Sequence, residues 1–187
     1  MSRQALRARL LDARTAFAKG PEFESAERSI CAHLGELLAA LEPDLLGVYW
    51  AVRSEFNLSL LITGIRAAGQ PLLALPFAHS ASVSGADAMH FRTWTEALPD
   101  ARDDCGIASS AGRPVVPDVV LVPCVGFARS GYRMGYGGGY FDRWLALNPH
   151  VTAVGVAWSG SEIDEAEFGA QSHDIAMSLI VTEKGAV

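Results

Sequence analysis

The sequence predicts an α/β fold in three layers, with a mostly parallel sheet between helices on both faces. Short apolar runs, such as VVLVP at 119–123, alternate along the chain with amphipathic stretches of helical period. Half of the residues are apolar, which is enough to bury parallel strands on both faces. No repeat or shift of composition divides the 187 residues, so we expect one domain over 1–187.

Helices are predicted where apolar side chains recur every three or four positions. The first stripe begins with Leu6 and Leu10 and reaches Phe17. Pro43 ends the second helix, and Gly69 ends the third. The four predicted helices cover residues 3–18, 24–42, 55–67 and 140–147.

Strands are predicted where short apolar runs lie between turn residues. The predicted strands cover 45–51, 71–76, 88–94, 118–123, 151–158 and 178–183. The intervening segment 95–117 is rich in proline, glycine, serine and aspartate, and we expect a long surface loop there. Ligands of such sheets bind beyond the carboxyl ends of the strands. A site is therefore expected after the strand at 118–123.

Charge and cysteine usage exclude several classes of function. The net charge is −6, from 15 basic and 21 acidic residues, which disfavours a nucleic-acid partner. The three cysteines, Cys31, Cys105 and Cys124, form no CxxC pair, and their odd number favours a reduced compartment. The sequence contains no run of about 18 apolar residues, so no membrane span is expected. The N-terminus also lacks the apolar centre of a signal peptide. We expect a soluble cytoplasmic protein, with a monomer slightly favoured.

The stretch GYRMGYGGGYFD, residues 131–142, is the strongest functional signal. Its glycines allow backbone conformations that a β-carbon forbids, and they let N–H groups approach a ligand closely. The helix predicted at 140–147 would direct its free N–H groups back at this loop, which favours phosphate binding. Arg133 adds a charged donor. The stretch matches neither a P-loop nor G-x-G-x-x-G, since Tyr140 replaces the last glycine, and a flexible turn without ligand is the alternative.

The longer run LVPCVGFARSGYRMGYGGGYFDRWLA, residues 121–146, resembles the signature of 5-formyltetrahydrofolate cyclo-ligases. Three further features follow the order of that family: the basic pair Arg3 and Arg7, the lone glutamate Glu55, and SHDIAMSLIVTE at 172–183. The resemblance implies a Rossmann-like fold. It also implies ATP- and Mg²⁺-dependent conversion of 5-formyltetrahydrofolate to 5,10-methenyltetrahydrofolate through an iminium phosphate, in which the substrate supplies both nucleophiles.

The resemblance also implies a role for each site residue. Arg133 and Asp142 would be catalytic, Asp142 and Asp174 would hold the magnesium ion, and Glu55 would bind the pterin ring. Trp50 and Tyr140 would line the folate pocket. The phosphates of ATP would be held by Arg3, Arg7, Arg133, Gly135, Tyr136, Gly137, Gly138, Gly139, Tyr140 and Phe141.

Each assignment has a purely structural alternative. Arg3 and Arg7 would lie on a solvated helix face, and Glu55 would be a first-turn carboxylate favoured by the helix dipole. Trp50 would belong to the core, and Asp174 would cap a turn.

The chain also departs from the family pattern at several positions. Arg3 replaces lysine, Cys124 glycine, Ala128 aspartate and Phe141 tyrosine, and GIASS at 106–110 replaces G-I-x-E-P. These changes keep open a folate- and nucleotide-binding regulatory protein with little turnover. A weaker alternative is an enzyme acting on sugar phosphates or coenzyme A, which would need a catalytic carboxylate over the glycine loop.

Overall fold

The computed structural model describes residues 1–80 and 88–187. Its centre is an eight-stranded sheet in the order β12-β11-β10-β7-β1-β2-β3-β6. These strands are β1 (Leu45–Gly47), β2 (Leu72–Ala78), β3 (Met89–Thr93), β6 (Pro114–Val115), β7 (Val119–Pro123), β10 (Thr152–Val156), β11 (Leu179–Thr182) and β12 (Gly185–Ala186). The five inner strands, from β11 to β2, are mutually parallel, and the outer pairs are antiparallel.

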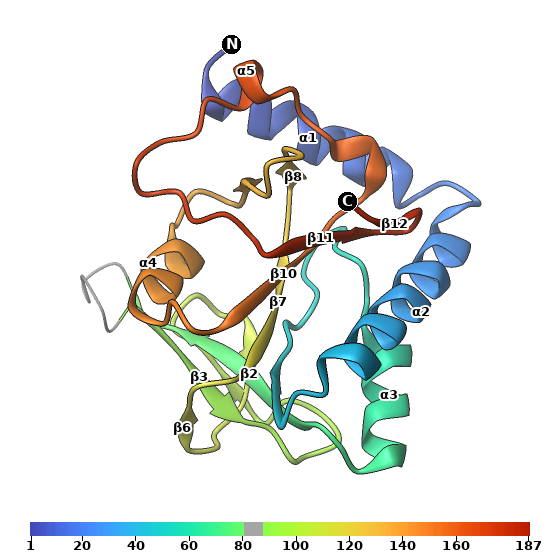
Figure 1. Cartoon of the computed structure of the whole chain (residues 1–187), viewed down its shortest axis with the longest axis vertical. Coiled ribbons are helices and arrows are strands. Elements are labelled where there is room, and N and C mark those ends of the chain that lie inside the picture. The colour runs from blue at the N-terminus through green and yellow to red at the C-terminus, as the bar shows by residue number, and fades with distance from the viewer. Residues whose placement is uncertain (81–87) are drawn as a thin grey trace.

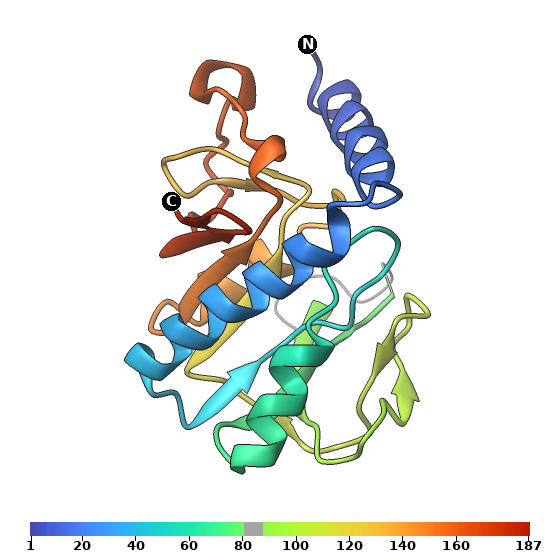
Figure 2. The same ribbon diagram turned by 90° about the vertical axis from the view of Figure 1, so that its right-hand side faces the viewer.

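Helices cover both faces of this sheet, as the sequence predicts. The helices are α1 (Arg3–Phe17), α2 (Phe23–Leu41), α3 (Ser59–Ala68), α4 (Tyr140–Leu147) and the single turn α5 (Glu165–Phe168). Helices α2 and α3 pack on one face and α4 on the other (Figures 1 and 2). On the α4 face, Trp144 packs edge-to-face on Phe91 of β3, with ring centroids 4.9 Å apart.

Helix α1 lies across the carboxyl ends of the strands rather than on a face of the sheet (Figure 1). Ser2 begins the helix, because its hydroxyl accepts a hydrogen bond from the N–H of Ala5 at 3.2 Å. The buried side chains of Leu6 and Leu10 pack against Met134 in a separate small core. The apolar stripe read from the sequence therefore fixes α1 over the loops that follow the strands.

Two short antiparallel pairs lie outside the main sheet. Strand β4 (Ala101–Arg102) pairs with β5 (Ala108–Ser109), and β8 (Gly126–Phe127) pairs with β9 (Arg133–Met134). The second pair holds the start of the glycine stretch directly beyond β7. No helix in the described residues is long and apolar enough to cross a membrane.

The structure confirms the predicted fold class and the bounds of α4, and it corrects three local expectations. The segment 95–117 is not one long loop, because β4, β5 and β6 form within it. The strand predicted over 45–51 ends at Gly47, so Trp50 lies beyond it. The helix predicted over 55–67 begins at Ser59, where the Asn57 side chain accepts the Ser59 N–H. The expectation of one domain remains a prediction.

Candidate active site

A cavity of about 840 Å³ lies at the carboxyl ends of β1, β2 and β7, beneath α1. Proline and alanine residues at the ends of β2 and β7 form its floor, and the glycine loop forms one wall. Every residue for which we predict a site role lines it: Arg3, Arg7, Trp50, Glu55, Arg133, Gly135, Tyr136, Gly137, Gly138, Gly139, Tyr140, Phe141, Asp142 and Asp174. The fold thus gathers four separate segments of the chain around one volume.

The glycine loop needs glycine at specific positions. Gly137 and Gly139 have φ values of +98° and +62°, in the left-handed region that disfavours side chains. Gly138 has no such φ, but a β-carbon there would lie 2.8 Å from the ring of Tyr140. Gly139 also precedes the first turn of α4, and no side chain caps that helix. The first N–H groups of α4 are therefore left for an anion or water.

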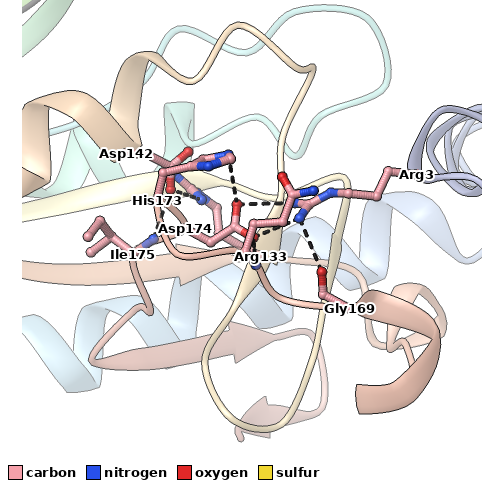
Figure 3. A network of polar contacts seen from close by, with 8 residues as sticks. Arg3, Arg133, Asp142, Gly169, His173, Asp174 and Ile175 are labelled. Carbon is pink, nitrogen blue, oxygen red and sulfur yellow. Dashed lines mark hydrogen bonds and ion pairs between the residues drawn. The ribbon is translucent and has the colours of Figure 1, made fainter.

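Two arginine–carboxylate pairs stand at this end of the cavity (Figure 3). Arg3 donates to both oxygens of Asp174, at 2.7 and 3.1 Å. Arg133 donates to Oδ1 of Asp142 at 2.8 Å, and its side chain is only 4% exposed. The N–H of Ile175, next in the chain to Asp174, donates to the same Oδ1 at 3.0 Å and connects the two pairs.

The two carboxylates differ in whether an oxygen remains free to bind a ligand. Both oxygens of Asp174 accept bonds from Arg3, and Oδ2 also accepts from the N–H of Gln171. Although burial opposes it, these hydrogen bonds lower the pKa of Asp174. Asp142 accepts only through Oδ1 among the described residues, so its Oδ2 is available for a cation. Asp174 also caps a turn, as its structural alternative proposes.

Arg7 is not on a solvated helix face. Its Nε donates to the carbonyl oxygen of Gly135 at 2.7 Å. Its guanidinium also lies 3.4 Å from the place that a β-carbon on Gly137 would occupy. Arg7 therefore anchors the glycine loop to α1, with its terminal N–H groups at the wall of the cavity.

The opposite end of the cavity is aromatic and holds the buried carboxylate of Glu55. Glu55 is 7% exposed and accepts the N–H of Val52 at 2.8 Å. Burial raises the pKa of Glu55 above its ordinary value, although that hydrogen bond, the charge of Arg14 and a hydrogen bond with Tyr136 oppose the rise. Because α3 begins at Ser59, the dipole explanation for Glu55 is wrong.

The position of Trp50 agrees with both interpretations, as a residue of the cavity wall and as part of the core. Its half-buried ring lines the cavity and also packs edge-to-face on Trp94, with centroids 6.0 Å apart. Tyr140 also lines the cavity, and its hydroxyl donates to the carbonyl oxygen of His79 at 2.9 Å. Cys105 lies 3.4 Å from that hydroxyl. The sequence reasoning missed Cys105 as a lining residue, because nothing in 95–117 indicated a strand pair folded against the cavity.

Three departures from the family pattern lie outside the cavity lining. Ala128 is fully buried in the small core under α1. Cys124 follows β7 and is buried. Burial raises the pKa of its thiol to about 12, so the side chain acts as a small hydrophobe. Ser109, in the GIASS segment, is fully buried and donates to the carbonyl oxygen of Pro76 at 2.7 Å. None of the three residues lines the cavity.

Comparison with known families gives a match over almost the whole chain. The sequence model described as the 5-formyltetrahydrofolate cyclo-ligase family matches residues 1–183. Two curated relatives bear the name 5-formyltetrahydrofolate cyclo-ligase. The one from Mycoplasma pneumoniae is 35% identical over 68 residues, and the one from Mycolicibacterium smegmatis is 39% identical over 69 residues. Each match covers 36% of this chain, and 40% and 34% of the respective relatives.

Solved structures resemble the whole fold. A 5,10-methenyltetrahydrofolate synthetase from Mycoplasma pneumoniae superposes with a TM-score of 0.75 at 22% identity, covering 98% of this chain and 99% of that protein. A second protein of that name, from Aquifex aeolicus, gives a TM-score of 0.77 at 25% identity, covering 100% and 92%. At 22% identity, the similarity to the first of these structures indicates a shared fold only.

Proposed function

Because this chain belongs to the 5-formyltetrahydrofolate cyclo-ligase family, we propose that it closes 5-formyltetrahydrofolate to 5,10-methenyltetrahydrofolate with consumption of ATP. One observation carries the proposal: a single cavity joins an anion-binding end, made by the glycine loop and three arginines, to an aromatic end with a buried carboxylate. A phosphate-transferring enzyme acting on a pterin needs both ends within reach of each other.

The reaction places few chemical demands on the protein. The formyl oxygen of the substrate attacks the γ-phosphorus of ATP, and the bond to ADP breaks. N10 then adds to the activated formyl carbon and loses its proton, and the C–O bond to phosphate breaks as the ring closes. Both nucleophiles belong to the substrate, so the protein acts by holding the reactants and by neutralising charge. The inert thiol of Cys124 agrees with a mechanism without an enzyme nucleophile.

The anion-binding end supplies the charge neutralisation. Arg133, Arg7 and Arg3 would hold the phosphate oxygens together with the backbone N–H groups from Gly135 to Phe141. The arginines are already placed by carboxylates and a carbonyl, so little side-chain freedom is lost when the nucleotide binds.

Asp142 fits a magnesium ligand, because its Oδ2 accepts no hydrogen bond from the described residues. Asp174 fits only if Arg3 moves from it to the phosphates. No group of three or more metal-binding side chains occurs in the part of the chain that the structure describes. Mg²⁺ prefers such a sparse site, which phosphate and water oxygens complete, and there it would neutralise the charge of the transferred phosphoryl group.

The aromatic end would hold the folate. Glu55 would accept N–H groups of the pterin ring, while Trp50 and Tyr140 would pack on the ring faces. The direct test is incubation of the protein with 5-formyltetrahydrofolate, ATP and Mg²⁺, following the absorbance of the conjugated methenyl product. We expect product only when all three are present.

A binding protein without turnover predicts tight binding of both ligands and no methenyl product. No structural observation favours that alternative, because Ala128 and the GIASS serines lie away from the cavity wall. An enzyme for sugar phosphates or coenzyme A gains no support from the family match.

A further inference from the structure

Arg14 is a buried charged residue of the site region that no role above explains. It lies in the last turn of α1, seven positions after Arg7 and so on the same side of the helix, and is 5% exposed. Its Nη2 donates to the hydroxyl of Tyr136, and its Nη1 makes a long contact of 3.5 Å with the carbonyl oxygen of Cys124. Its Nε is buried without a partner among the described residues.

A structural role alone accounts poorly for this side chain. Burying a guanidinium is costly, and an unpartnered N–H adds to the cost. An apolar side chain of similar length would fill the space beside α1 without that penalty. The one strong contact of Arg14 instead goes to Tyr136, a residue of the glycine loop that lines the cavity.

The Tyr136 hydroxyl connects Arg14 to Glu55. A hydroxyl has one proton to donate. Here the oxygen accepts from Arg14, which leaves that proton for the Glu55 carboxylate, with which Tyr136 interacts. The ring of Tyr136 also lies between two cations, with Arg14 Cζ at 5.5 Å and Arg53 Cζ at 5.1 Å from its centroid. The hydrogen bonds therefore run in one direction, from guanidinium to phenol to carboxylate.

We propose that Arg14 is a positioning residue for folate binding, which holds the Glu55 carboxylate through the Tyr136 hydroxyl in the orientation that accepts pterin N–H groups. The inference rests on the proposed function, because it assumes that Glu55 binds the pterin. Arg14 itself does not line the cavity. Its effect on the ligand is therefore indirect.

The arrangement makes folate binding depend on pH. The ionisable groups that interact with Glu55 come from several elements: Arg14, Arg53, Tyr136, Tyr49 and Cys124. Burial raises the pKa of Glu55, and Arg14 opposes the rise. Protonation removes an acceptor, so folate affinity should fall as the pH falls through this raised pKa. Removing the charge of Arg14 should move that fall to higher pH.

The test measures the affinity for 5-formyltetrahydrofolate by calorimetry from pH 5 to pH 9 in the full-length protein. Arg14→Met should weaken folate binding about tenfold near neutrality, the usual size of a lost charged hydrogen bond, and should shift the pH midpoint upward. Arg14→Lys, which keeps the charge, should stay near the parent midpoint. ATP affinity should change less than about threefold, because Arg7 still anchors the loop at Gly135.

Two further variants separate positioning from folding. Tyr136→Phe keeps the ring but removes the connecting hydroxyl, and it should reproduce the loss of folate affinity even if Arg14→Met folds poorly. In a Glu55→Gln background, Arg14→Met should cause no further loss. Arg9→Met is the matched control, since Arg9 lies on α1 in an exposed pair with Glu167 and should leave folate binding unchanged.

The outcomes distinguish this role from the function on which it rests. An equal loss at every pH, or the same loss in the Glu55→Gln background, would show that Arg14 only supports the fold and would overturn the role. Absence of 5-formyltetrahydrofolate binding by the unaltered protein would overturn the proposed function and the role together.

Discussion

At the glycine-loop end of the cavity each of the two site carboxylates faces an arginine, whereas at the aromatic end Glu55 is buried without an ion pair among the described residues. Paired charges stay balanced over a wide range of pH, and the pKa of Asp174 is lowered accordingly. The pKa of Glu55 is raised, chiefly by burial. This difference supports the proposal that the first end binds a ligand of fixed charge and the second a neutral ring that presents N–H groups.

Because of this difference, substitutions at the two ends should change different measured quantities. Substitutions at the first end should change nucleotide binding and rate with little dependence on pH near neutrality. Substitutions at the second end should change folate binding, and the change should depend on pH.

Asp142→Asn should lower the rate of methenyl formation at least about a hundredfold, comparable to losing one strong electrostatic contact to developing charge. The amide retains an oxygen that can accept the Ile175 N–H, so the protein should fold and still bind 5-formyltetrahydrofolate. The measurement is turnover at limiting and at saturating Mg²⁺.

Asp164→Asn provides the control, since Asp164 caps α5 outside the cavity and asparagine caps helices as well. It should keep the parental rate. Near-parental turnover by Asp142→Asn at limiting Mg²⁺ would contradict the metal assignment.

Gly137→Ala should weaken ATP binding about tenfold while sparing folate affinity. Its φ of +98° costs a side chain on the order of 1–2 kcal/mol, and the new β-carbon would lie in contact with the Arg7 guanidinium at 3.4 Å. Gly185→Ala is the matched control, with a φ of +114° and open space around it at the start of β12. Equal losses of thermal stability with unequal losses of ATP affinity are expected. Parental ATP affinity in Gly137→Ala would favour the flexible-turn interpretation.

Glu55→Gln should weaken folate binding several-fold at pH 8 and leave ATP binding unchanged. An amide keeps one acceptor oxygen where the carboxylate has two, so the loss is partial. Because the pKa of Glu55 is raised, the parent should lose folate affinity as the pH falls, whereas the variant should show a nearly flat profile. The measurement is calorimetry of folate binding as a function of pH. A variant with the parental pH profile would mean that a group other than Glu55 titrates.

Much of the fold was predictable because periodicity is local. The apolar positions of α3 and the glycine at its end were identified from the sequence, since each depends on neighbours within one or two turns. The short strands β4, β5 and β6 were not, because they carry no period of their own and form only through pairing and contacts within the folded chain. Strand ends also shifted, as at Gly47, where no signal in the sequence marks the end of the strand.

The features of the site likewise divide into those that the sequence revealed and those that it did not. The glycine loop could be found because its composition has few other uses, and the family resemblance located Arg3, Arg7 and Asp174. The pairing of Arg3 with Asp174 across 171 positions could not be read from spacing. Arg14 left a weak signal, its place seven residues after Arg7, but a basic residue in a last helical turn is explained as well by the helix dipole.

The smallest effect concerns the stability that the first end contributes. Arg3→Met should lower the melting temperature by about 1–3 °C at pH 7, because the pair is partly screened by solvent. The pKa of Asp174 is lowered in the fold, so this stability is fully present above the ordinary aspartate pKa of about 3.9 and is lost as the pH falls through the lower folded value. The difference in melting temperature between parent and variant should therefore be constant from pH 5 to pH 8 and should shrink below pH 4. Arg9→Met, on the same helix in a more exposed pair, should show a smaller difference. A difference for Arg3→Met that persists unchanged at pH 3 would mean that the side chain stabilises α1 by packing on Phe168, 5.0 Å away, and not by its charge.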